Sequence, residues 1–349
     1  MSFILGVDTG GTYTDAVILE DEERVIAFSK ALTTHSDLSL GIGSAIQKAL
    51  KQRNTAPEKI SLVSLSTTLA TNALVEGQGD RVALIMIGFK DSDLEKHSIF
   101  DALKGDPFLV IEGGHNYAGF EKSPLAKNKM SKWVSKIKGV SAYAVCSQFA
   151  VRNPEHELEA AKIIRKLTEK PVSLSHQISA KLNGPKRALT AVLNARLIAL
   201  IDLLIVKAEL VIKNLGILAP LMVVRGDGAL ISAAQAREKP IETILSGPAA
   251  SIVGARWLTS ETEAIISDIG GTTTDIAVLK GGKPAIDPRG ASVGPYRTMV
   301  EAVAMYTFGL GGDSEVKLRV EGSGGDISLG PKRVIPVALA ASIEPDLIH

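Results

Sequence analysis

Two short stretches contain the residue types best suited to chemistry in this sequence. They read "DTGGTYTD" (residues 8–15) and "DIGGTTTD" (residues 268–275). In each, an aspartate ends an apolar run, a Gly-Gly pair follows, and Thr-x-Thr-Asp leads into a second apolar run. Aligned without gaps over twelve positions from Asp8 and from Asp268, the copies share seven residues: Asp, Gly, Gly, Thr, Thr, Asp and Leu. One copy is a common kind of turn, whereas two copies favour duplicated lobes with a shared task.

Both stretches indicate binding of a phosphate group together with a metal ion. Glycine lacks a Cβ, so successive backbone N–H groups can converge on an anion without steric cost, and the threonine hydroxyls add donors. The leading aspartates, Asp8 and Asp268, offer the hard oxygen ligands that Mg²⁺ prefers. Two such turns on two lobes would contact phosphate from both sides. Neither stretch is a Walker A loop, because no Gly-Lys-Ser/Thr follows, and neither reads G-x-G-x-x-G.

The surrounding residues predict the elements that position these turns. In each copy two apolar strands flank the glycines, which predicts a β-hairpin. Residues 37–54 place apolar side chains on one helical face, with Asp37 or Ser36 as the N-cap. Residues 81–89 and 140–146 are apolar runs typical of buried parallel strands. This alternation of strands and helices favours an α/β architecture.

The rest of the chain gives weaker signals. Residues 92–130 are less regular and include the Gly-rich turn "EGGHNYAGF", so we expect loops around an inserted subdomain. Asn153 is expected to cap a helix that starts at Pro154. The most apolar long stretch, residues 192–212, is interrupted by charged side chains, which indicates a buried helix rather than a membrane span.

Length and composition limit the class of protein. The 349 residues, 45% of them hydrophobic, are enough for two domains. A formal net charge of +1 with evenly mixed signs gives no basic surface for a nucleic acid. Cys146 is the single cysteine, so no internal disulfide can form, and residues 2–7 lack the pattern of a signal peptide. We therefore expect a cytoplasmic protein that binds neither nucleic acid nor membrane.

The duplicated Asp-x-Gly-Gly-Thr hairpins resemble the two phosphate loops of the actin, sugar-kinase and heat-shock ATPase superfamily. Within it, the chain resembles the hydantoinase A/oxoprolinase family over nearly its whole length, in stretches such as "STTLATNALVEGQGDRVALIMIGFKD", "AVCSQFAVRNPEHE", "VLNARL" and "AREKPIETILSGPAASIVGA". The resemblance implies an α/β fold of two ribonuclease-H-like lobes, the actin-like ATPase fold, with an inserted α/β subdomain. We expect the N-terminal lobe over residues 1–180, with the insertion at about 80–180, and the second lobe over residues 181–349.

The same resemblance implies an ATP-dependent hydrolase. Members of the family use ATP to open a lactam such as 5-oxoproline or a hydantoin, or to activate a ketone for carboxylation. Phosphorylation of a lactam carbonyl oxygen would provide a good leaving group for attack by water, and phosphoryl transfer mostly requires positioning and charge neutralisation. The expected substrate is thus a small cyclic amide or a ketone, with ATP and Mg²⁺ as cofactors. A hydantoinase B-type partner subunit and self-association both stay open.

The resemblance also assigns roles to individual residues. Asp8 and Asp268 would hold Mg²⁺ through water, and Asp15 or Asp275 would lie nearby as a base or metal partner. The residues expected to contact the nucleotide are Thr9, Gly10, Gly11, Thr12, Gly270, Gly271, Thr272, Thr273, Gly311 and Gly312. The last two belong to "GLGGDS", residues 309–314, which we expect to follow an apolar helix and to form the adenosine loop. No single residue stands out as the general base.

Other residues near these stretches have a structural and a functional interpretation. Pro248 is expected in the first turn of a helix with Ser246 or Gly247 as cap, so that the positive helix end either faces the nucleotide or is merely capped. His115 and His176 lack partners at metal-ligand spacing and are expected to be structural. Cys146 is expected to lie in the core.

The sequence departs from the family pattern at three places. Leu65 and Ser66 stand where relatives usually have His-Gly, which removes a proton-transfer group. Asp313 lies in a loop that usually reads Gly-Ala-Gly-Gly-Gly-Ser, and it would place a carboxylate beside the nucleotide. The chain ends before the family's usual Pro-Gly-Pro segment, which indicates a short branch or a truncated chain. Two further classes stay open: a small-molecule kinase, and a nucleotide-switched binding protein similar to actin or the chaperone ATPases.

Overall fold

The computed structural model describes residues 2–271, 273–319 and 326–348, so the predicted site residue Thr272 lies outside the described residues. The chain forms two compact units. The first consists of Met1–Ala249 and Asp287–Ala302, and the second of Ala250–Ile286 and Val303–His349. The first unit extends past residue 180 because the helix and strands that follow pack within it. The lobe boundary between residues 180 and 181 stays a prediction.

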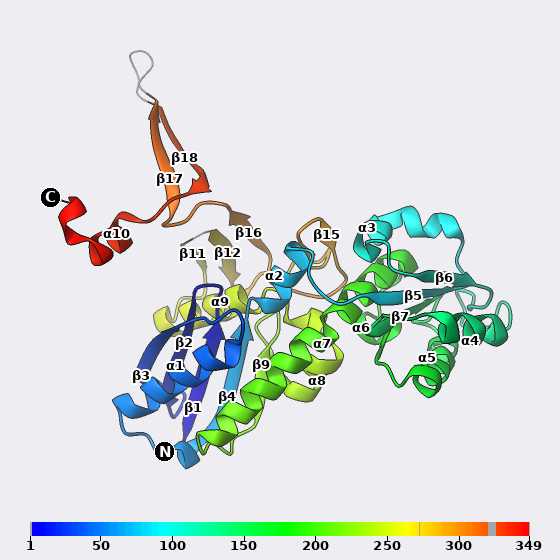
Figure 1. Cartoon of the computed structure of the whole chain (residues 1–349), viewed down its shortest axis with the longest axis horizontal. Coiled ribbons are helices and arrows are strands. Elements are labelled where there is room, and N and C mark those ends of the chain that lie inside the picture. The colour runs from blue at the N-terminus through cyan, green and yellow to red at the C-terminus, as the bar shows by residue number, and fades with distance from the viewer. Residues whose placement is uncertain (1, 272, 320–325, 349) are drawn as a thin grey trace. The chain divides into compact units, whose positions relative to one another are not determined.

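A six-stranded mixed sheet forms one part of the first unit (Figure 1). Its strands, in spatial order, are β10 (Leu230–Ser232), β9 (Leu221–Val224), β4 (Ile60–Thr67), β1 (Phe3–Thr9), β2 (Tyr13–Glu20) and β3 (Arg24–Leu32). The first three strands of the chain are antiparallel neighbours, whereas β4 and β9 run parallel to β1. Side chains alternate along β1, so Val7 and Thr9 are buried while Asp8 lies on the other, half-buried face. The α/β fold and the first hairpin are confirmed.

Helix α1 (Leu38–Gln52) covers the buried face of this sheet, packing against β2 and β3. The side chain of Asp37 accepts a hydrogen bond from the backbone N–H of Ser39 at 3.1 Å, which makes Asp37 the N-cap. The apolar residues recur at helical spacing and are all buried: Ile42, Ala45, Ile46, Ala49 and Leu50. The helix predicted over 37–54 is therefore confirmed.

The inserted subdomain contains a four-stranded parallel sheet. Its order is β6 (Phe108–Ile111), β5 (Val82–Ile87), β7 (Ala142–Ser147) and β8 (Val172–Leu174). Every residue of β5 and β7 is buried, because α4 (Lys127–Lys136) and α5 (Glu155–Thr168) cover one face and a long helix covers the other. This matches the buried strands predicted at 81–89 and 140–146.

Two details of this subdomain differ from the sequence prediction. The segment 92–130 is more regular than expected, since it contains most of the 3₁₀ segment η2 (Asp91–Ser98), helix α3 (Ile99–Leu103) and strand β6. Helix α5 begins one residue later than predicted, with Pro154 in the N-cap position. The side chain of Asn153 still accepts a hydrogen bond from the N–H of Glu155 at 3.0 Å, so it satisfies a donor of the first turn.

The long helix α7 (Gly184–Asn214) contains the apolar stretch noted in the sequence. It packs against α1 at the six-stranded sheet and against β5 and β7 of the parallel sheet (Figure 1). By length and composition it could cross a membrane, but 67% of its most apolar window is buried inside the protein. The prediction of a buried helix is confirmed, and a single core includes residues of α7, β1 and β5.

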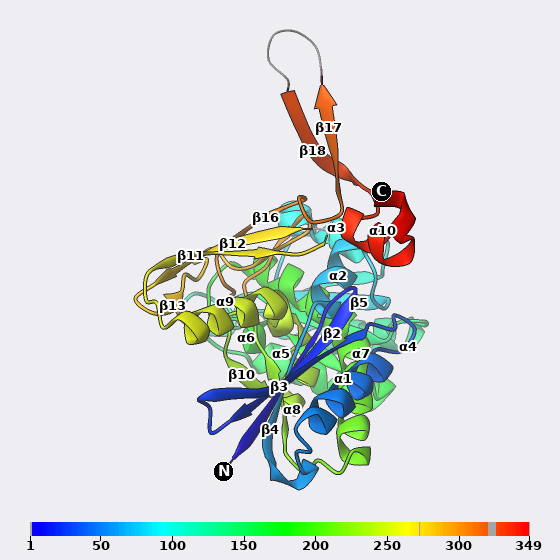
Figure 2. The same cartoon turned by 90° about the vertical axis from the view of Figure 1, so that its left-hand side faces the viewer.

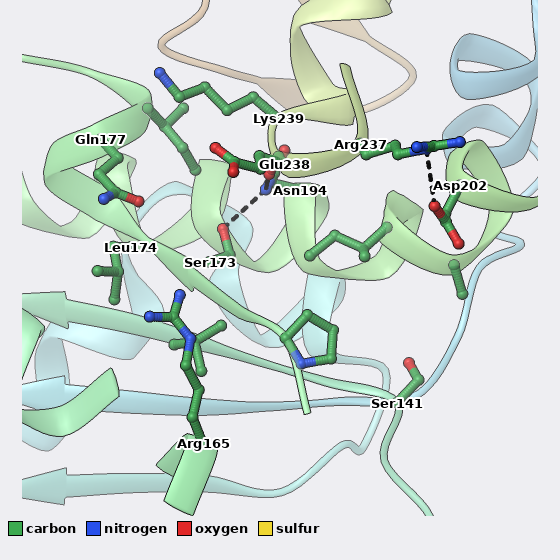
Figure 3. A pocket seen from close by; sticks show the side chains of 15 residues that line it. Ser141, Arg165, Ser173, Leu174, Gln177, Asn194, Asp202, Arg237, Glu238 and Lys239 are labelled. Atoms are coloured by element: carbon green, nitrogen blue, oxygen red, sulfur yellow. Dashed lines mark hydrogen bonds and ion pairs between the residues drawn. The ribbon is translucent and has the colours of Figure 1, made fainter. Parts of the chain in front are cut away.

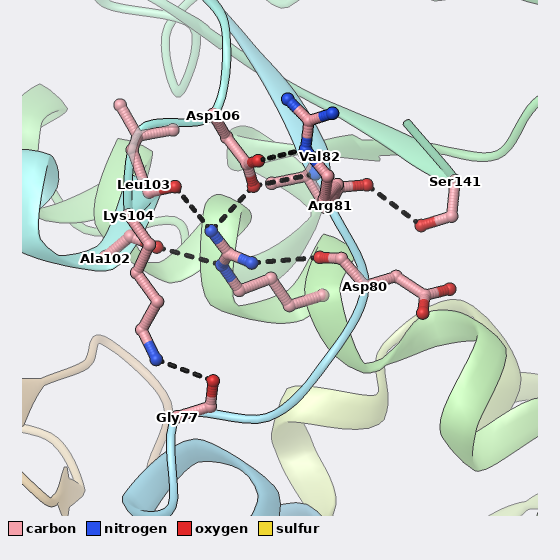
Figure 4. A network of polar contacts seen from close by, with 10 residues as sticks. Gly77, Asp80, Arg81, Val82, Ala102, Leu103, Lys104, Asp106 and Ser141 are labelled. Atoms are coloured by element: carbon pink, nitrogen blue, oxygen red, sulfur yellow. Dashed lines mark hydrogen bonds and ion pairs between the residues drawn. The ribbon is translucent and has the colours of Figure 1, made fainter. Parts of the chain in front are cut away.

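A buried polar network surrounds the Asp106 carboxylate (Figure 4). Arg196 of α7 belongs to this network. Its guanidinium donates to the carbonyl oxygens of Ala102, Leu103 and Asp80 at 2.7–2.9 Å and to the Asp106 carboxylate at 2.7 Å. The same carboxylate accepts from the N–H of Val82 at 3.0 Å. These bonds satisfy carbonyls at the end of α3 and join α3, β5 and α7.

Shorter elements complete the first unit. They are η1 (Pro57–Lys59), α2 (Leu69–Val75), α6 (Ser175–Ile178), α8 (Ala233–Glu238), η3 (Pro240–Thr243), β14 (Ser292–Val293) and β15 (Tyr296–Arg297).

The second unit repeats the antiparallel start of the first. Hairpin β11 (Ala264–Ile269) and β12 (Thr274–Lys280) is joined by β16 (Met305–Phe308), which pairs with β12 as β3 pairs with β2. A two-stranded ribbon of β17 (Ser314–Arg319) and β18 (Asp326–Arg333) is followed by α10 (Val337–Ile343) (Figure 2). The remaining elements are β13 (Lys283–Pro284), η4 (Pro345–Ile348) and α9 (Ser246–Thr259), whose first residues belong to the first unit.

Candidate functional site

The turn between β1 and β2 is closed by a hydrogen bond from the N–H of Gly10 to the carbonyl of Tyr13, at 3.0 Å. Neither Gly10 nor Gly11 has a left-handed backbone, so the turn does not need glycine for its conformation. A Cβ at Gly11 would meet no atom within 4 Å, whereas one at Gly10 would come within 3.1 Å of the Tyr13 carbonyl. Glycine at position 11 therefore leaves the outer side of the turn open for close approach.

In this turn the backbone carbonyls are hydrogen-bonded, whereas two backbone N–H groups are not. Thr33 donates from its N–H to the Thr12 carbonyl at 3.0 Å and from its hydroxyl to the Gly10 carbonyl at 2.9 Å. The backbone N–H groups of Gly11 and Thr12 have no hydrogen-bond partner among the described residues. An exposed turn with two unpaired N–H groups can accept an anion. The Thr9 hydroxyl instead points to the buried face and is also unpaired within the described part.

Asp8 lies at the end of β1, directly opposite Asp15 in β2 and opposite Ser66 in β4. The Ser66 hydroxyl donates to Oδ1 of Asp8 at 2.5 Å. Asp15 forms an ion pair with Lys30, with Nζ and Oδ1 2.7 Å apart. The two predicted carboxylates of this hairpin thus share one face of the sheet but have different partners.

The start of helix α9 lies beside the same strand ends. The Ser246 hydroxyl donates to the Thr67 carbonyl at 2.9 Å and accepts from the Thr67 N–H at 3.2 Å. A Cβ placed on Gly247 would lie 3.8 Å from Oδ1 of Asp8. The first turn of this 14-residue helix therefore approaches the Asp8 carboxylate, where the helix dipole favours negative charge. Because α9 begins at Ser246, neither Ser246 nor Gly247 precedes the helix as its cap, and the predicted cap is wrong. The Ser246 hydroxyl instead joins the start of the helix to β4.

The second hairpin has the same turn bond, from the Gly270 N–H to the Thr273 carbonyl at 2.9 Å. Asp268 lies opposite Asp275, as Asp8 lies opposite Asp15. Burial raises the pKa of Asp275 and the nearby Asp268 charge adds to the effect, while a 2.5 Å hydrogen bond from the Thr307 hydroxyl opposes it. Two facing carboxylates with one pKa raised are common at functional sites.

The Gly-rich loop after β16 lies directly on this second turn. The N–H of Gly312 donates to the Gly270 carbonyl at 3.0 Å, and the N–H of Asp313 donates to the Gly271 carbonyl at 2.9 Å. The predicted residues Gly311, Gly312, Gly270 and Gly271 are thus brought together. A strand, β16, precedes the loop, so the expected apolar helix is wrong; pairing with β12 decides the conformation there.

Asp313 is buried and paired. The guanidinium of Arg333, at the end of β18, donates to its Oδ2 at 2.5 and 2.8 Å. Its other oxygen, Oδ1, is buried and has no hydrogen-bond partner among the described residues. The Asp313 carboxylate is therefore largely balanced by an arginine within the same unit.

The other singled-out residues lie within the first unit. Cys146 is fully buried, and burial raises the pKa of its thiol to about 12, so the expected core role is confirmed. His176 donates from Nδ1 to the buried Glu157 carboxylate, 2.6 Å away. His115 is buried, and neither ring nitrogen has a hydrogen-bond partner in the described chain. Among the described residues no group of three potential metal ligands of the His, Cys, Asp or Glu type comes together.

Four residues that contact the predicted site did not come from the hairpin motif: Ser66, Ser246, Thr307 and Arg333. Ser66 could have been found from the run of hydroxyl residues at the end of the strand over 60–67. Ser246 could have been found from the Ser-Gly-Pro start of α9. No sequence pattern distinguishes Thr307 or Arg333 from other polar residues.

The strand order, the insertion and the two Asp-Gly-Gly hairpins define an α/β protein of the actin-like ATPase fold. Residues 4–168 match the family model of the hydantoinase/oxoprolinase N-terminal region. Residues 187–336 match the hydantoinase/oxoprolinase family model. The chain therefore belongs to the hydantoinase/oxoprolinase family.

Curated relatives support this assignment. The chain is 28% identical to caprolactamase subunit alpha of Pseudomonas jessenii, over 89% of this chain and 48% of that protein. It is 25% identical to the acetophenone carboxylase gamma subunit of Aromatoleum aromaticum, over 94% and 49%. It is 24% identical to 5-oxoprolinase 1 of Arabidopsis thaliana, over 94% and 29%. The chain thus spans about half the length of the first two.

Two solved structures share the fold. The ATP-dependent caprolactamase from Pseudomonas jessenii matches with a TM-score of 0.79 and 26% identity, over 95% of this chain and 51% of that chain. The nucleotide-free structure of acetone carboxylase matches with a TM-score of 0.78 and 21% identity, over the same shares. The expected fold class is confirmed.

Proposed function

We propose that this chain is the nucleotide-binding part of an ATP-dependent hydrolase that activates the carbonyl of a lactam or related cyclic amide. The observation behind the proposal is the turn after β1, where two unpaired N–H groups, of Gly11 and Thr12, follow the Asp8 carboxylate within four residues. Family membership and relatives named caprolactamase and 5-oxoprolinase support this reaction class. We also propose that the substrate is a small molecule, that a hydantoinase B-type subunit is the candidate partner, and that the protein acts in the cytoplasm.

The residues present fit Mg-ATP. Carboxylate oxygens of Asp8 and Asp268 are of the type that coordinates Mg²⁺ directly or through water. The residues that would contact phosphates are Gly10, Gly11, Thr12, Gly270 and Gly271, with Gly311 and Gly312 toward the nucleoside. ATP would supply the phosphoryl group that makes an amide oxygen a good leaving group. Because the two hairpins share seven of twelve residues and the same turn hydrogen bond, we propose that they serve one nucleotide.

The protein groups would act by position and charge. Ser66 fixes the Asp8 carboxylate at the end of β1, and the start of α9 adds a positive helix end near it. Burial raises the pKa of Asp275, so this carboxyl holds a proton more readily than an exposed aspartate does. Asp15 is instead held as an ion pair by Lys30. We propose Asp275 as a base or metal partner on this ground.

The first test is nucleotide binding. Titration calorimetry should detect Mg-ATP and Mg-ADP, and either ligand should raise the melting temperature by linkage. The Asp8→Asn variant, which keeps the size of the side chain, is the matched control. A folded protein that binds neither nucleotide at millimolar concentration would remove the proposal.

The second test separates the reaction classes. ATP turnover is measured with a panel of lactams, hydantoins and ketones, with and without a candidate hydantoinase B-type subunit. A ring-opened product supports the hydrolase, whereas a phosphorylated product indicates a small-molecule kinase. A carboxylated ketone indicates the carboxylase alternative, which the acetophenone carboxylase relative favours. Substrate-independent turnover with partner release would instead indicate a nucleotide-switched binding protein.

A further inference from the structure

A hollow of about 620 Å³ lies in the first unit, and no residue of the β1–β2 hairpin lines it (Figure 3). It lies between the edge strand β8, the last turn of α5, helix α7 and the end of α8. Its apolar wall consists of Pro171, Val172, Leu174, Ile178, Ile198 and Ala199. This size and an apolar wall are typical of small-molecule sites.

Most polar groups of the hollow are already paired. Arg237 forms ion pairs with Asp202 at 3.1 Å and with Glu209 at 2.7 Å. The side-chain amide of Asn194 donates to the Ser173 hydroxyl at 3.0 Å and to a backbone carbonyl at 3.1 Å. The ammonium of Lys239 lies 4.0 Å from Glu242. These pairs fix the wall and leave little charge for a ligand.

Two charged side chains in the hollow have no ion-pair or hydrogen-bond partner among the described residues. They are Arg165, from the last turn of α5, and Glu238, from the end of α8. Figure 3 shows the guanidinium and the carboxylate reaching in from different elements, with the Gln177 amide at the side. They do not pair with each other, so the hollow presents one positive and one negative group separated by an apolar surface.

We propose that this hollow binds a short straight-chain amino acid. Its carboxylate would pair with Arg165, its ammonium with Glu238, and its methylene chain would lie on the apolar wall. The identity of the ligand rests on the proposed function. When water opens a lactam, the C–N bond breaks, the carbonyl carbon gains a hydroxyl group and the nitrogen gains a hydrogen. At neutral pH the product has the same two opposite charges on one chain.

The test is calorimetry without nucleotide, with 6-aminohexanoate, hexanoate and hexylamine as probes. The zwitterion should bind at least about tenfold more tightly than either singly charged probe, since each lacks one charge-assisted contact. Arg165→Gln and Glu238→Gln should each weaken 6-aminohexanoate binding by about tenfold. Lys166→Gln and Glu169→Gln, exposed neighbours outside the hollow, should leave it unchanged. Melting temperatures confirm that each variant is folded.

The outcomes are distinct. The amino-acid site would be overturned by equal binding of hexanoate and 6-aminohexanoate or by binding that survives both variants. It would also be overturned by no binding of 6-aminohexanoate at about 10 mM, roughly tenfold above the upper end of common KM values. Because these titrations need no ATP, a failed lactam panel would overturn the proposed function and leave the amino-acid site standing.

Discussion

Oγ of Ser66 and Oδ1 of Asp8 are 2.5 Å apart, on neighbouring parallel strands in direct register. This hydrogen bond orients the carboxylate that leads the first turn.

Ser66→Ala should weaken Mg²⁺ binding at Asp8, because the carboxylate loses a donor that fixes its orientation. We expect about tenfold more Mg²⁺ to be required for nucleotide binding, with a loss of about 1–2 kcal/mol in the free energy of unfolding. Calorimetry with Mg²⁺ titration and urea denaturation measure the two effects. Ser64→Ala, on the same strand, is the control, and an equal Mg²⁺ requirement in both variants would contradict the orienting role.

Asp8→Asn and Asp268→Asn test whether the two hairpins serve one nucleotide. Each change is nearly isosteric and should keep the fold, but each should lower ATP turnover about 100-fold or more through weaker metal positioning. The double variant should be scarcely worse than either single variant, because residues that act as a unit are non-additive. Turnover and melting temperature are compared for all four proteins. Full activity in folded Asp268→Asn would mean that the second hairpin is a relic of duplication.

Asp275→Asn should raise stability near neutral pH. A carboxyl whose folded pKa is raised by burial favours the folded state below its unfolded pKa, and this contribution is lost as pH rises through the folded pKa. The gain from asparagine should therefore be largest at neutral pH and vanish at acidic pH. Melting temperatures between pH 4 and 8, about the range where carboxyl groups and histidine titrate, measure it.

Asp227→Asn is the opposite control. Burial works against ionisation there, but the Arg225 ion pair and the Ala229 N–H outweigh it and lower the pKa of Asp227. Its stabilising contribution is present above the unfolded pKa and lost as pH falls through the folded one. Asp227→Asn should thus destabilise at neutral pH, and a shift of the same sign in both variants would refute the assignment.

Arg196→Met should strongly destabilise the first unit, because it removes the buried guanidinium that pairs with Asp106 and leaves three carbonyls without this donor. Removing one partner of a buried ion pair costs about 3–5 kcal/mol. Arg81→Gln is the matched control: Arg81 also contacts Asp106 at 3.0 Å, but 61% of its side chain is exposed, so its loss should cost about 1 kcal/mol or less. Denaturant unfolding measures the loss in the free energy of unfolding for both variants. An equally small loss in both would contradict a structural role for the Arg196 network.

The hairpins, α1 and the buried strands could be predicted because their signals are local. The Gly-Gly pair and the flanking apolar residues lie within about a dozen positions of each other, and the burial pattern of α1 follows its own period. The strand β6 was missed because its four residues include one fully buried side chain and show no alternation. The segment of β16 was predicted to be helical because its apolar residues alone do not reveal that it pairs with β12.

The contacts around the site were harder to predict because they join distant parts of the chain. Ser66 and Asp8 are 58 residues apart, and Ser246 and Thr67 are 179 apart. Serines and threonines are common, so no spacing marks the ones that meet. Arg333 was missed for the same reason, although Asp313 had been noted as an unusual carboxylate.

The position of α7 has a consequence for how the first unit folds. Its apolar residues close the core under the six-stranded sheet and also cover one face of β5 and β7. Excision of residues 80–180 would therefore expose that side of α7 to water, and isolation of the insertion would expose the matching face of its sheet. The two sheets should unfold in one cooperative transition, and neither should behave as an autonomous folding module.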